Sequence, residues 1–203
     1  YAYFDGQALG RRRTGAGVLG SRTHCPNESS EFRKNKKHIF QKGRMNMTQE
    51  IVIHKNPNGD TRTAPKGITF EQFQEANDSH RDDVNKVISV LSLMLSENGL
   101  KHDWTKKSEE KMFYSDFIEA VAGGIDFVSG EWYQLHVNTE RHHLLSRCPE
   151  DVNLLDVIEM IVDCVCAGKT RSGEVRDLEI STDILEKALK NTVKLIDDMT
   201  VVK

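Results

Sequence analysis

The chain has 203 residues, of which 37% are hydrophobic and 29% charged, and its formal net charge is −3. This length suits one domain or two small ones, with enough core that neither disulfides nor a structural metal is needed merely to fold. No stretch approaches the roughly 18 apolar residues of a membrane span. The four cysteines lack CxxC spacing, and no apolar signal region precedes them. We therefore expect a cytoplasmic protein with reduced thiols and no membrane partner.

Charge is unevenly distributed along the chain. Residues 1–45 carry ten Lys and Arg against three Asp and Glu, whereas residues 46–203 carry 18 against 28. The acidic body argues against nucleic acid as a partner, although the basic segment could be an arm. That segment has no sustained apolar period, so we expect it to be disordered. Codons for the residues before Met45 can form a ribosome-binding sequence, which predicts that the segment is a non-native translated leader and that the natural protein starts at Met45 or Met47. A genuine basic tail is the alternative.

The next part of the chain, residues 46–68, predicts an extended arm. A β-like piece at 51–53 is followed by turn signals at Asn58-Gly59 and Pro65. From residue 69 to residue 203 the apolar period is helical. Thr69 and Gln72 form a capping box, and Asn98-Gly99 predicts the end of this first helix.

Further helices are predicted by the same kinds of signal. They are a helix capped by Ser108, one over about 129–145, one over 154–167 capped by Asn153, and a last one opened by Ser181. We therefore predict an all-α bundle of five or more helices, preceded by the disordered basic segment.

Histidines are the most informative feature of this helical region. Five of them lie between residues 80 and 143, namely His80, His102, His136, His142 and His143. Imidazole and carboxylate together are the ligands that Zn, Mn, Fe and Ni centres use. His102 is followed directly by Asp103, and Asp156, Glu159 and Asp163 share one face of a predicted helix. Lys106, one turn after Asp103, could contact a phosphate oxygen.

The order of these residues resembles a known family. His80, His102-Asp103 and Asp163 are similar to the H…HD…D signature of the HD-domain metal-dependent phosphohydrolase superfamily, and residues 102–106 fit its HDxxK form. Residues 78–198 look closer still to a family of small phage and bacterial proteins known only as a domain of unknown function. Four segments carry that similarity: His102-Asp103-Trp104-Thr105-Lys106, Asn138…His142-His143, Glu159-Met160…Asp163 and Asn191-Thr192-Val193.

The resemblance implies an HD-like all-α fold and a centre with one or two divalent transition metals (Mn, Fe, Ni or Zn). Its implied ligands are His80, His102, Asp103, His136, His142, His143 and Asp163. It implies catalytic roles for Asp103, for Lys106 as a phosphate contact, and for Glu159 as a general base or as a residue that orients a ligand. The alternative is that these side chains are caps and members of a polar network. If His142 and His143 are adjacent on a helix, at most one faces the site, and Asp156 is expected to be solvated.

Two functions follow as expectations. The first is a metal-dependent phosphohydrolase that acts on a small phosphorylated substrate, such as a nucleotide, in a bacterial or phage-infected bacterial cell. The second is a non-catalytic phage or bacterial binding protein, such as a nucleotide sponge or inhibitor, with an HD-like metal or ligand site. A di-iron oxygenase is a third and weaker possibility. The glycine-tyrosine-proline motif of the cyclic-dinucleotide enzymes is missing, so the substrate does not follow, and neither does the oligomeric state.

Overall fold

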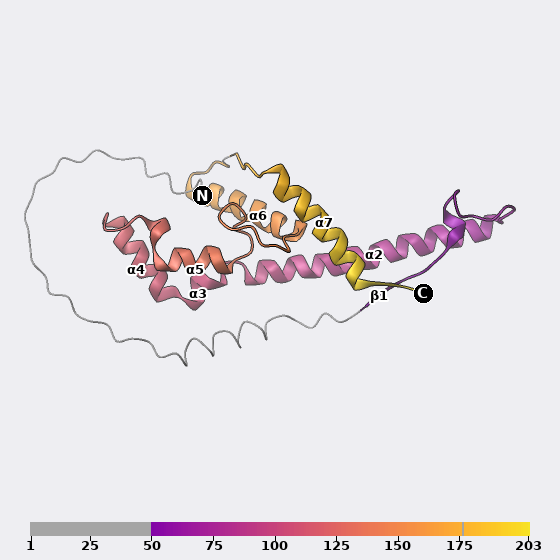
Figure 1. The fold of residues 1–203 in the computed structure, drawn as a ribbon, viewed down its shortest axis with the longest axis horizontal. Coiled ribbons are helices and arrows are strands. Elements are labelled where there is room, and N and C mark those ends of the chain that lie inside the picture. The colour runs from indigo at the N-terminus through magenta and orange to yellow at the C-terminus, as the bar shows by residue number, and fades with distance from the viewer. Residues whose placement is uncertain (1–49, 176) are drawn as a thin grey trace, which may run out of the picture. The chain divides into compact units, whose positions relative to one another are not determined.

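The computed structural model describes residues 50–175 and 177–203. The predicted leader or disordered segment (1–45) and residues 46–49 of the predicted arm therefore lie outside the described residues. Most of the described residues are helical, so the prediction of an all-α fold is confirmed. In chain order the elements are β1 (Ile51–Ile53), the 3-10 helix η1 (Pro57–Gly59), α2 (Phe70–Lys101), α3 (Trp104–Ser108), α4 (Glu110–Val121), the 3-10 helix η2 (Phe127–Ser129), α5 (Glu131–Thr139), α6 (Leu154–Arg171), α7 (Thr182–Met199) and β2 (Thr200–Val202) (Figure 1).

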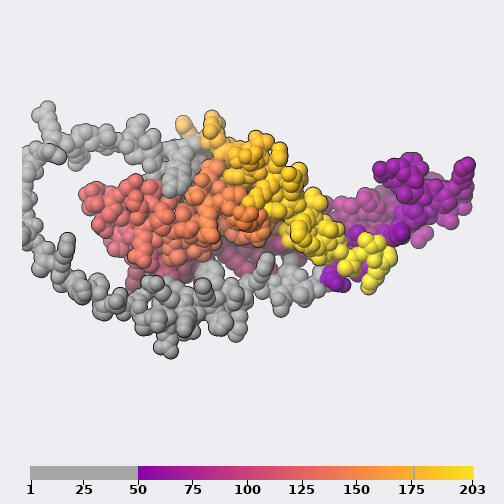
Figure 2. Space-filling model, viewed as in Figure 1, coloured from indigo at the N-terminus to yellow at the C-terminus, as the bar shows by residue number. Residues whose placement is uncertain are grey.

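The predicted β-like piece is a strand whose partner comes from the end of the chain. β1 pairs with β2 in parallel, with Ile51 opposite Thr200. The segment after β1 runs back along the start of α2, where η1 packs against this helix. This segment and the first half of α2 extend beyond α6 and α7 (Figure 2). The sequence alone gave no signal for β2, because a three-residue strand needs its partner in order to form.

The long helix α2 begins as predicted and ends later than predicted. Thr69 and Gln72 form both hydrogen bonds of the capping box. The helix continues through Asn98-Gly99 to Lys101, because Gly99 does not adopt the left-handed conformation of a C-terminal cap. Asp103 takes that conformation instead, with φ 55° and ψ 28°. Asp tolerates this region better than most residues, and the turn at Asp103 separates α2 from α3.

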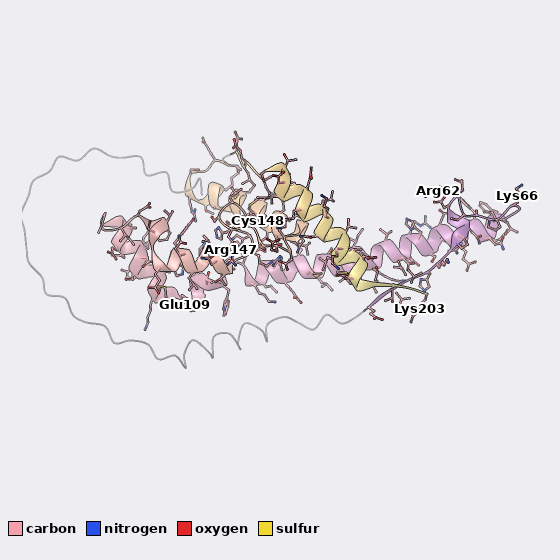
Figure 3. The ribbon with its side chains drawn as sticks, viewed as in Figure 1. Arg62, Lys66, Glu109, Arg147, Cys148 and Lys203 are labelled. Atoms are coloured by element: carbon pink, nitrogen blue, oxygen red, sulfur yellow. The ribbon has the colours of Figure 1, made fainter. Side chains whose placement is uncertain are left out.

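The middle helices differ from the prediction. Residues 104–108 form the short helix α3, so Ser108 ends a helix and caps none, and Glu109 precedes α4. The helix expected over 129–145 is η2 and α5, which stops at Thr139. Beyond Thr139 the backbone is extended and then turns, and the side chains of Glu140 and Arg141 bond Thr105 and Asp156 on other elements. The loop that follows carries Arg147 and Cys148 to the start of α6 (Figure 3).

The last two helices have the predicted caps. Asn153 caps α6 and forms a capping box with Asp156, and Ser181 caps α7. α6 packs against both α2 and α7, while α4 and α5 pack against each other. Buried apolar side chains of the described residues include Trp132, Leu144, Val152, Met160 and Ala188.

Among the helices of residues 50–175 and 177–203, none combines the length and apolar character needed to cross a bilayer.

Candidate metal centre

Four separate parts of the chain bring the candidate ligands together. His102 and Asp103 lie at the junction of α2 and α3, and His136 lies on the last turn of α5. His142 and His143 lie on the turn that follows α5, and Asp163 comes from the middle of α6. Because the turn at 142–143 is not helical, both of its histidines face the cluster. The limit of one facing histidine applied to two neighbours on a helix, and these two do not lie on one.

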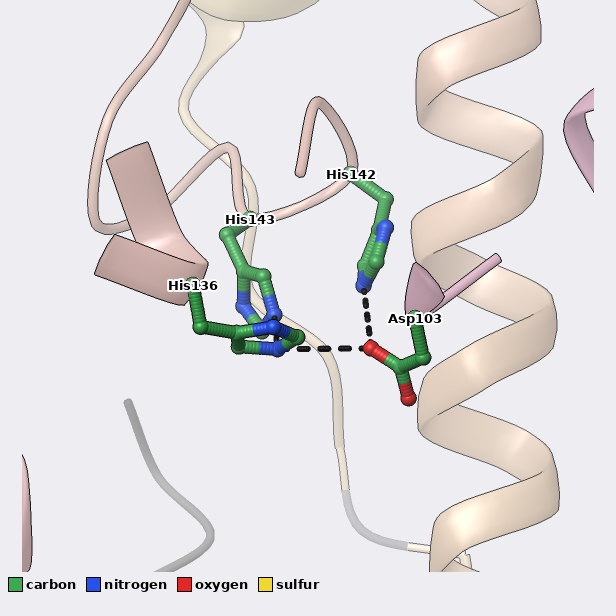
Figure 4. Close-up of side chains that lie close together, drawn as sticks. All are labelled: Asp103, His136, His142 and His143. Carbon is green, nitrogen blue, oxygen red and sulfur yellow. Dashed lines mark hydrogen bonds and ion pairs between the residues drawn. The ribbon is translucent and has the colours of Figure 1, made fainter. Parts of the chain in front are cut away.

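Asp103 lies at the centre of the first group of ligand atoms (Figure 4). Its Oδ1 lies 3.3 Å from Nε2 of His136 and 3.6 Å from Nε2 of His142. The Nε2 atoms of His136 and His143 are 2.7 Å apart. One ligand atom from each of Asp103, His136, His142 and His143 lies within 4.8 Å of all the others.

A second group lies on the other side of Asp103. Nε2 of His102 is 3.4 Å from Oδ2 of Asp103 and 3.4 Å from Oδ1 of Asp163. Ligand atoms of His102, His142 and Asp163 also lie within 4.8 Å of one another. The two groups share His142.

The spacing and the unmet hydrogen bonds both fit a cation. Two ligand atoms bound to one ion at about 2.1 Å, at roughly tetrahedral or octahedral angles, lie about 3.0–3.4 Å apart, which is close to the separations around Asp103. Within the described residues, Oδ1 of Asp103 and Nε2 of His142 are buried and make no hydrogen bond. Buried polar atoms without partners are rare, and an ion is one of the explanations for them. The described part of the chain therefore contains a His/Asp cluster that could hold a metal ion.

Burial keeps two of the histidines neutral. Burial lowers the pKa of His136 to about 4. It also lowers the pKa of His143 to about 3, with His142 and His136 adding to the effect. Both rings are therefore uncharged at pH 7, which is the form in which imidazole binds a metal.

The charge of the cluster is concentrated on its carboxylates. Burial opposes ionisation of Asp103, but hydrogen bonds with His102 and Lys106 hold the pKa of this carboxyl below its usual value. The same carboxylate, followed by those of Asp163 and Glu159, raises the pKa of His102 to about 12. Three carboxylates around one imidazole make this a place where positive charge is favoured.

Glu159 lies behind the imidazoles, away from the other ligand atoms. Its Oε1 is 3.0 Å from Nδ1 of His102 and 3.1 Å from Nδ1 of His142. Burial opposes its ionisation, yet these two histidines lower the pKa of Glu159 to about 2. A carboxylate on Nδ1 orients the ring so that Nε2 faces the metal side. The geometry thus favours the orienting role of Glu159 over the role of general base.

Two further polar residues complete the cluster, and the sequence analysis assigned no role to either. Thr105 is 3% exposed, and its Oγ1 lies 2.5 Å from Nδ1 of His136 and 2.7 Å from Oε1 of Glu140. The backbone N–H of Thr105 donates to the same Glu140 oxygen at 2.8 Å. Neither Thr105, within the HDWTK segment, nor Glu140, next to the His142-His143 turn, belongs to a recognisable sequence pattern of its own. Only the fold brings the two together.

An ion pair with one buried partner, Asp156, contacts the turn that carries His142 and His143. Arg141 donates through Nε and Nη2 to the two carboxylate oxygens of Asp156, each at 2.8 Å. Asp156 is 1% exposed and also accepts the backbone N–H of Asn153. Asp156 is therefore neither solvated, as expected from the sequence, nor among the candidate ligands.

The structure does not bring His80 to the cluster. His80 is exposed on α2 and lies 22 residues before His102, which is about 33 Å along a helix. The ammonium group of Lys106 does reach the cluster and donates to Oδ2 of Asp103. Of the two tryptophans, Trp132 is buried and stacks on His136, while Trp104 is 54% exposed.

Comparisons with protein-family models, with curated proteins and with solved structures found no match for this chain. The chemistry of the cluster is therefore the basis for assigning a function.

Proposed function

We propose that this protein is a metal-dependent phosphohydrolase that acts on a nucleotide or another small phosphoester. The observation that carries the proposal is the buried Oδ1 of Asp103, which makes no hydrogen bond within the described residues and faces the Nε2 atoms of His136 and His142. A carboxylate oxygen surrounded by imidazole nitrogens at these distances is the arrangement expected around a divalent transition metal.

The residues divide into two sets of ligands. One ion would be held by Asp103, His136, His142 and His143, whose ligand atoms converge. Because Nε2 of His142 can bind one ion only, a second ion would be held by His102 and Asp163, with Asp103 close by. Nitrogen and oxygen ligands of this kind suit Zn, Mn, Fe or Ni.

The chemistry follows from what each residue does around such an ion. A bound divalent metal supplies Lewis acidity and lowers the pKa of water towards about 7. Asp103 supplies negative charge on both sides of the centre. Lys106, whose side chain is 35% exposed at the edge of the cluster, would neutralise a phosphate oxygen. Glu159 would hold His102 and His142 in their ligating orientation. The resemblance of His102–Lys106 and Asp163 to the HD-domain signature supports the same reaction class.

Metal content of the full chain tests this proposal first. The purified protein and its Asp103→Asn variant would be incubated with Mn²⁺ or Zn²⁺, desalted and analysed by mass spectrometry of the metal. We expect one or two ions per chain in the wild type and a loss of bound metal in Asp103→Asn. His80→Asn is the matched control, because His80 lies outside the cluster, and it should bind as much metal as the wild type.

Activity is tested next with the metal-loaded protein. Release of inorganic phosphate or of a nucleoside from a panel of nucleotides and simple phosphoesters should be lost in Asp103→Asn. Lys106→Met should keep its metal and lose at least about tenfold in turnover. Absence of metal in the wild type would refute the proposal. Tight nucleotide binding without turnover would instead support the non-catalytic binding protein.

A further inference from the structure

Thr105 lies between the candidate ligand His136 and the carboxylate of Glu140. Its hydroxyl oxygen is 2.5 Å from Nδ1 of His136 and 2.7 Å from Oε1 of Glu140. Thr105 and His136 are each 3% exposed, so water does not compete for these hydrogen bonds.

The single hydroxyl proton decides the direction of both hydrogen bonds. A carboxylate oxygen only accepts, and Oε1 of Glu140 accepts both the backbone N–H and the hydroxyl of Thr105. With its proton given to Glu140, the Thr105 oxygen can only accept from His136. Nδ1 of His136 must therefore carry a proton, which leaves a lone pair on Nε2.

We propose that Thr105 and Glu140 are positioning residues that hold His136 in the Nδ1–H tautomer, so that its Nε2 lone pair is directed at Asp103. The importance of this for metal binding rests on the proposed function, but the tautomer itself does not. Trp132 stacks on the His136 ring with centroids 4.6 Å apart and planes inclined by 17°. The ring plane and the proton position are thus both fixed before any ion binds.

The same reasoning assigns the proton on His143. Its Nε2 lies 2.7 Å from Nε2 of His136, and two lone pairs would repel each other at that distance. In the metal-free protein His143 must therefore donate from Nε2. When both nitrogens bind one ion, His143 must carry its proton on Nδ1, whereas His136 keeps its tautomer. Within this pair, metal binding should thus move the proton of His143 and leave that of His136 in place.

Long-range ¹H–¹⁵N correlation spectra of the histidine rings distinguish the two neutral tautomers and need no bound metal. The experiment uses the full chain at pH 7, first without metal and then with Zn²⁺, with His136→Gln and His143→Gln variants to assign the signals. We expect Nδ1–H for His136 in both states. For His143 we expect Nε2–H without metal and Nδ1–H with it. An Nε2–H signal from His136 in the metal-free wild type would overturn the proposal.

A matched pair of variants tests the function of the two positioning residues. Thr105→Val keeps the side-chain shape and removes the hydroxyl, whereas Thr105→Ser keeps the hydroxyl. We expect Thr105→Val to lose the pure Nδ1–H signal and about 10- to 100-fold in Zn²⁺ affinity, measured by chelator competition. Thr105→Ser should restore both within about threefold. Equal Zn²⁺ affinity in all three folded proteins would refute the role in metal binding. A wild type that binds no Zn²⁺ but shows the expected tautomers would refute the metal site and leave the positioning of His136 supported.

Discussion

The ion pair between Arg141 and Asp156 gives the sharpest test of how the cluster is held. Arg141→Met keeps most of the apolar stem and removes the guanidinium. Asp156 is 1% exposed, so its carboxylate would remain buried, with the backbone N–H of Asn153 still donating to it. The two histidines that follow Arg141 would lose one of the contacts that tie their turn to α6, while the contact of His142 with Glu159 would remain.

The expected loss in the free energy of unfolding of Arg141→Met follows from the burial of Arg141 and Asp156. Removing one member of a fully buried pair costs about 3–5 kcal/mol, because the other charge is left without compensation. The Arg141 side chain is 41% exposed, so water can partly replace it, and we expect a loss of about 2–3 kcal/mol. This is a large share of the roughly 5–15 kcal/mol that stabilises a typical domain. The double variant Arg141→Met/Asp156→Asn has no buried charge and should regain more than half of the loss.

Urea unfolding at pH 7, followed by circular dichroism, measures the free energy of unfolding of each variant. Arg147→Met is the control, because Arg147 is exposed on the same loop and its side chain bonds only Asn138 within the described residues. This variant should change stability by less than about 0.5 kcal/mol. A loss below about 0.5 kcal/mol in Arg141→Met, or a double variant less stable than the single one, would show that the ion pair does not hold the turn.

Three further predictions address other parts of the molecule. The Lys86 ammonium and a backbone N–H hold the pKa of Asp83 at about 2, below its usual 3.8. The folded state therefore binds fewer protons, so this stabilisation is complete above about pH 4 and is lost as the pH falls towards 2. In urea unfolding, Asp83→Asn should reduce the drop in the free energy of unfolding over this pH range by about 1–2 kcal/mol. Trp132→Ala should cost about 3–5 kcal/mol in urea unfolding, whereas Trp104→Ala should change it by less than about 0.5 kcal/mol, and equal effects would contradict the assigned burial. Zn²⁺ at a hundredfold excess over its Kd should stabilise the wild type by about 2.7 kcal/mol, seen as a rise in Tm, and a similar rise in Asp103→Asn would argue against the site.

Local sequence signals determined the helical framework. Thr69, Asn153 and Ser181 cap the helices that they were predicted to cap, because a side-chain cap bonds backbone groups two or three residues away. The repeating apolar pattern also gave the all-α class. These features depend on neighbours in the sequence, so they can be predicted without the rest of the fold.

The candidate ligands could be predicted only in part. His102, Asp103 and Asp163 were chosen for their residue types and order, and the structure brings them together. His80 fits the same order, but an unbroken α2 carries it about 33 Å away. A pattern of residue types contains no information on helix length, so it could not distinguish the two cases.

The tertiary structure alone decided how the site is built. Glu140 bonds Thr105, and Arg141 bonds Asp156, so the chain leaves α5 before His142 and His143 and both rings face Asp103. The partners in these contacts are 35 and 15 residues apart. Helical periodicity describes neighbours within a few turns, and it therefore cannot predict where a distant carboxylate or hydroxyl will end a helix and orient a ligand.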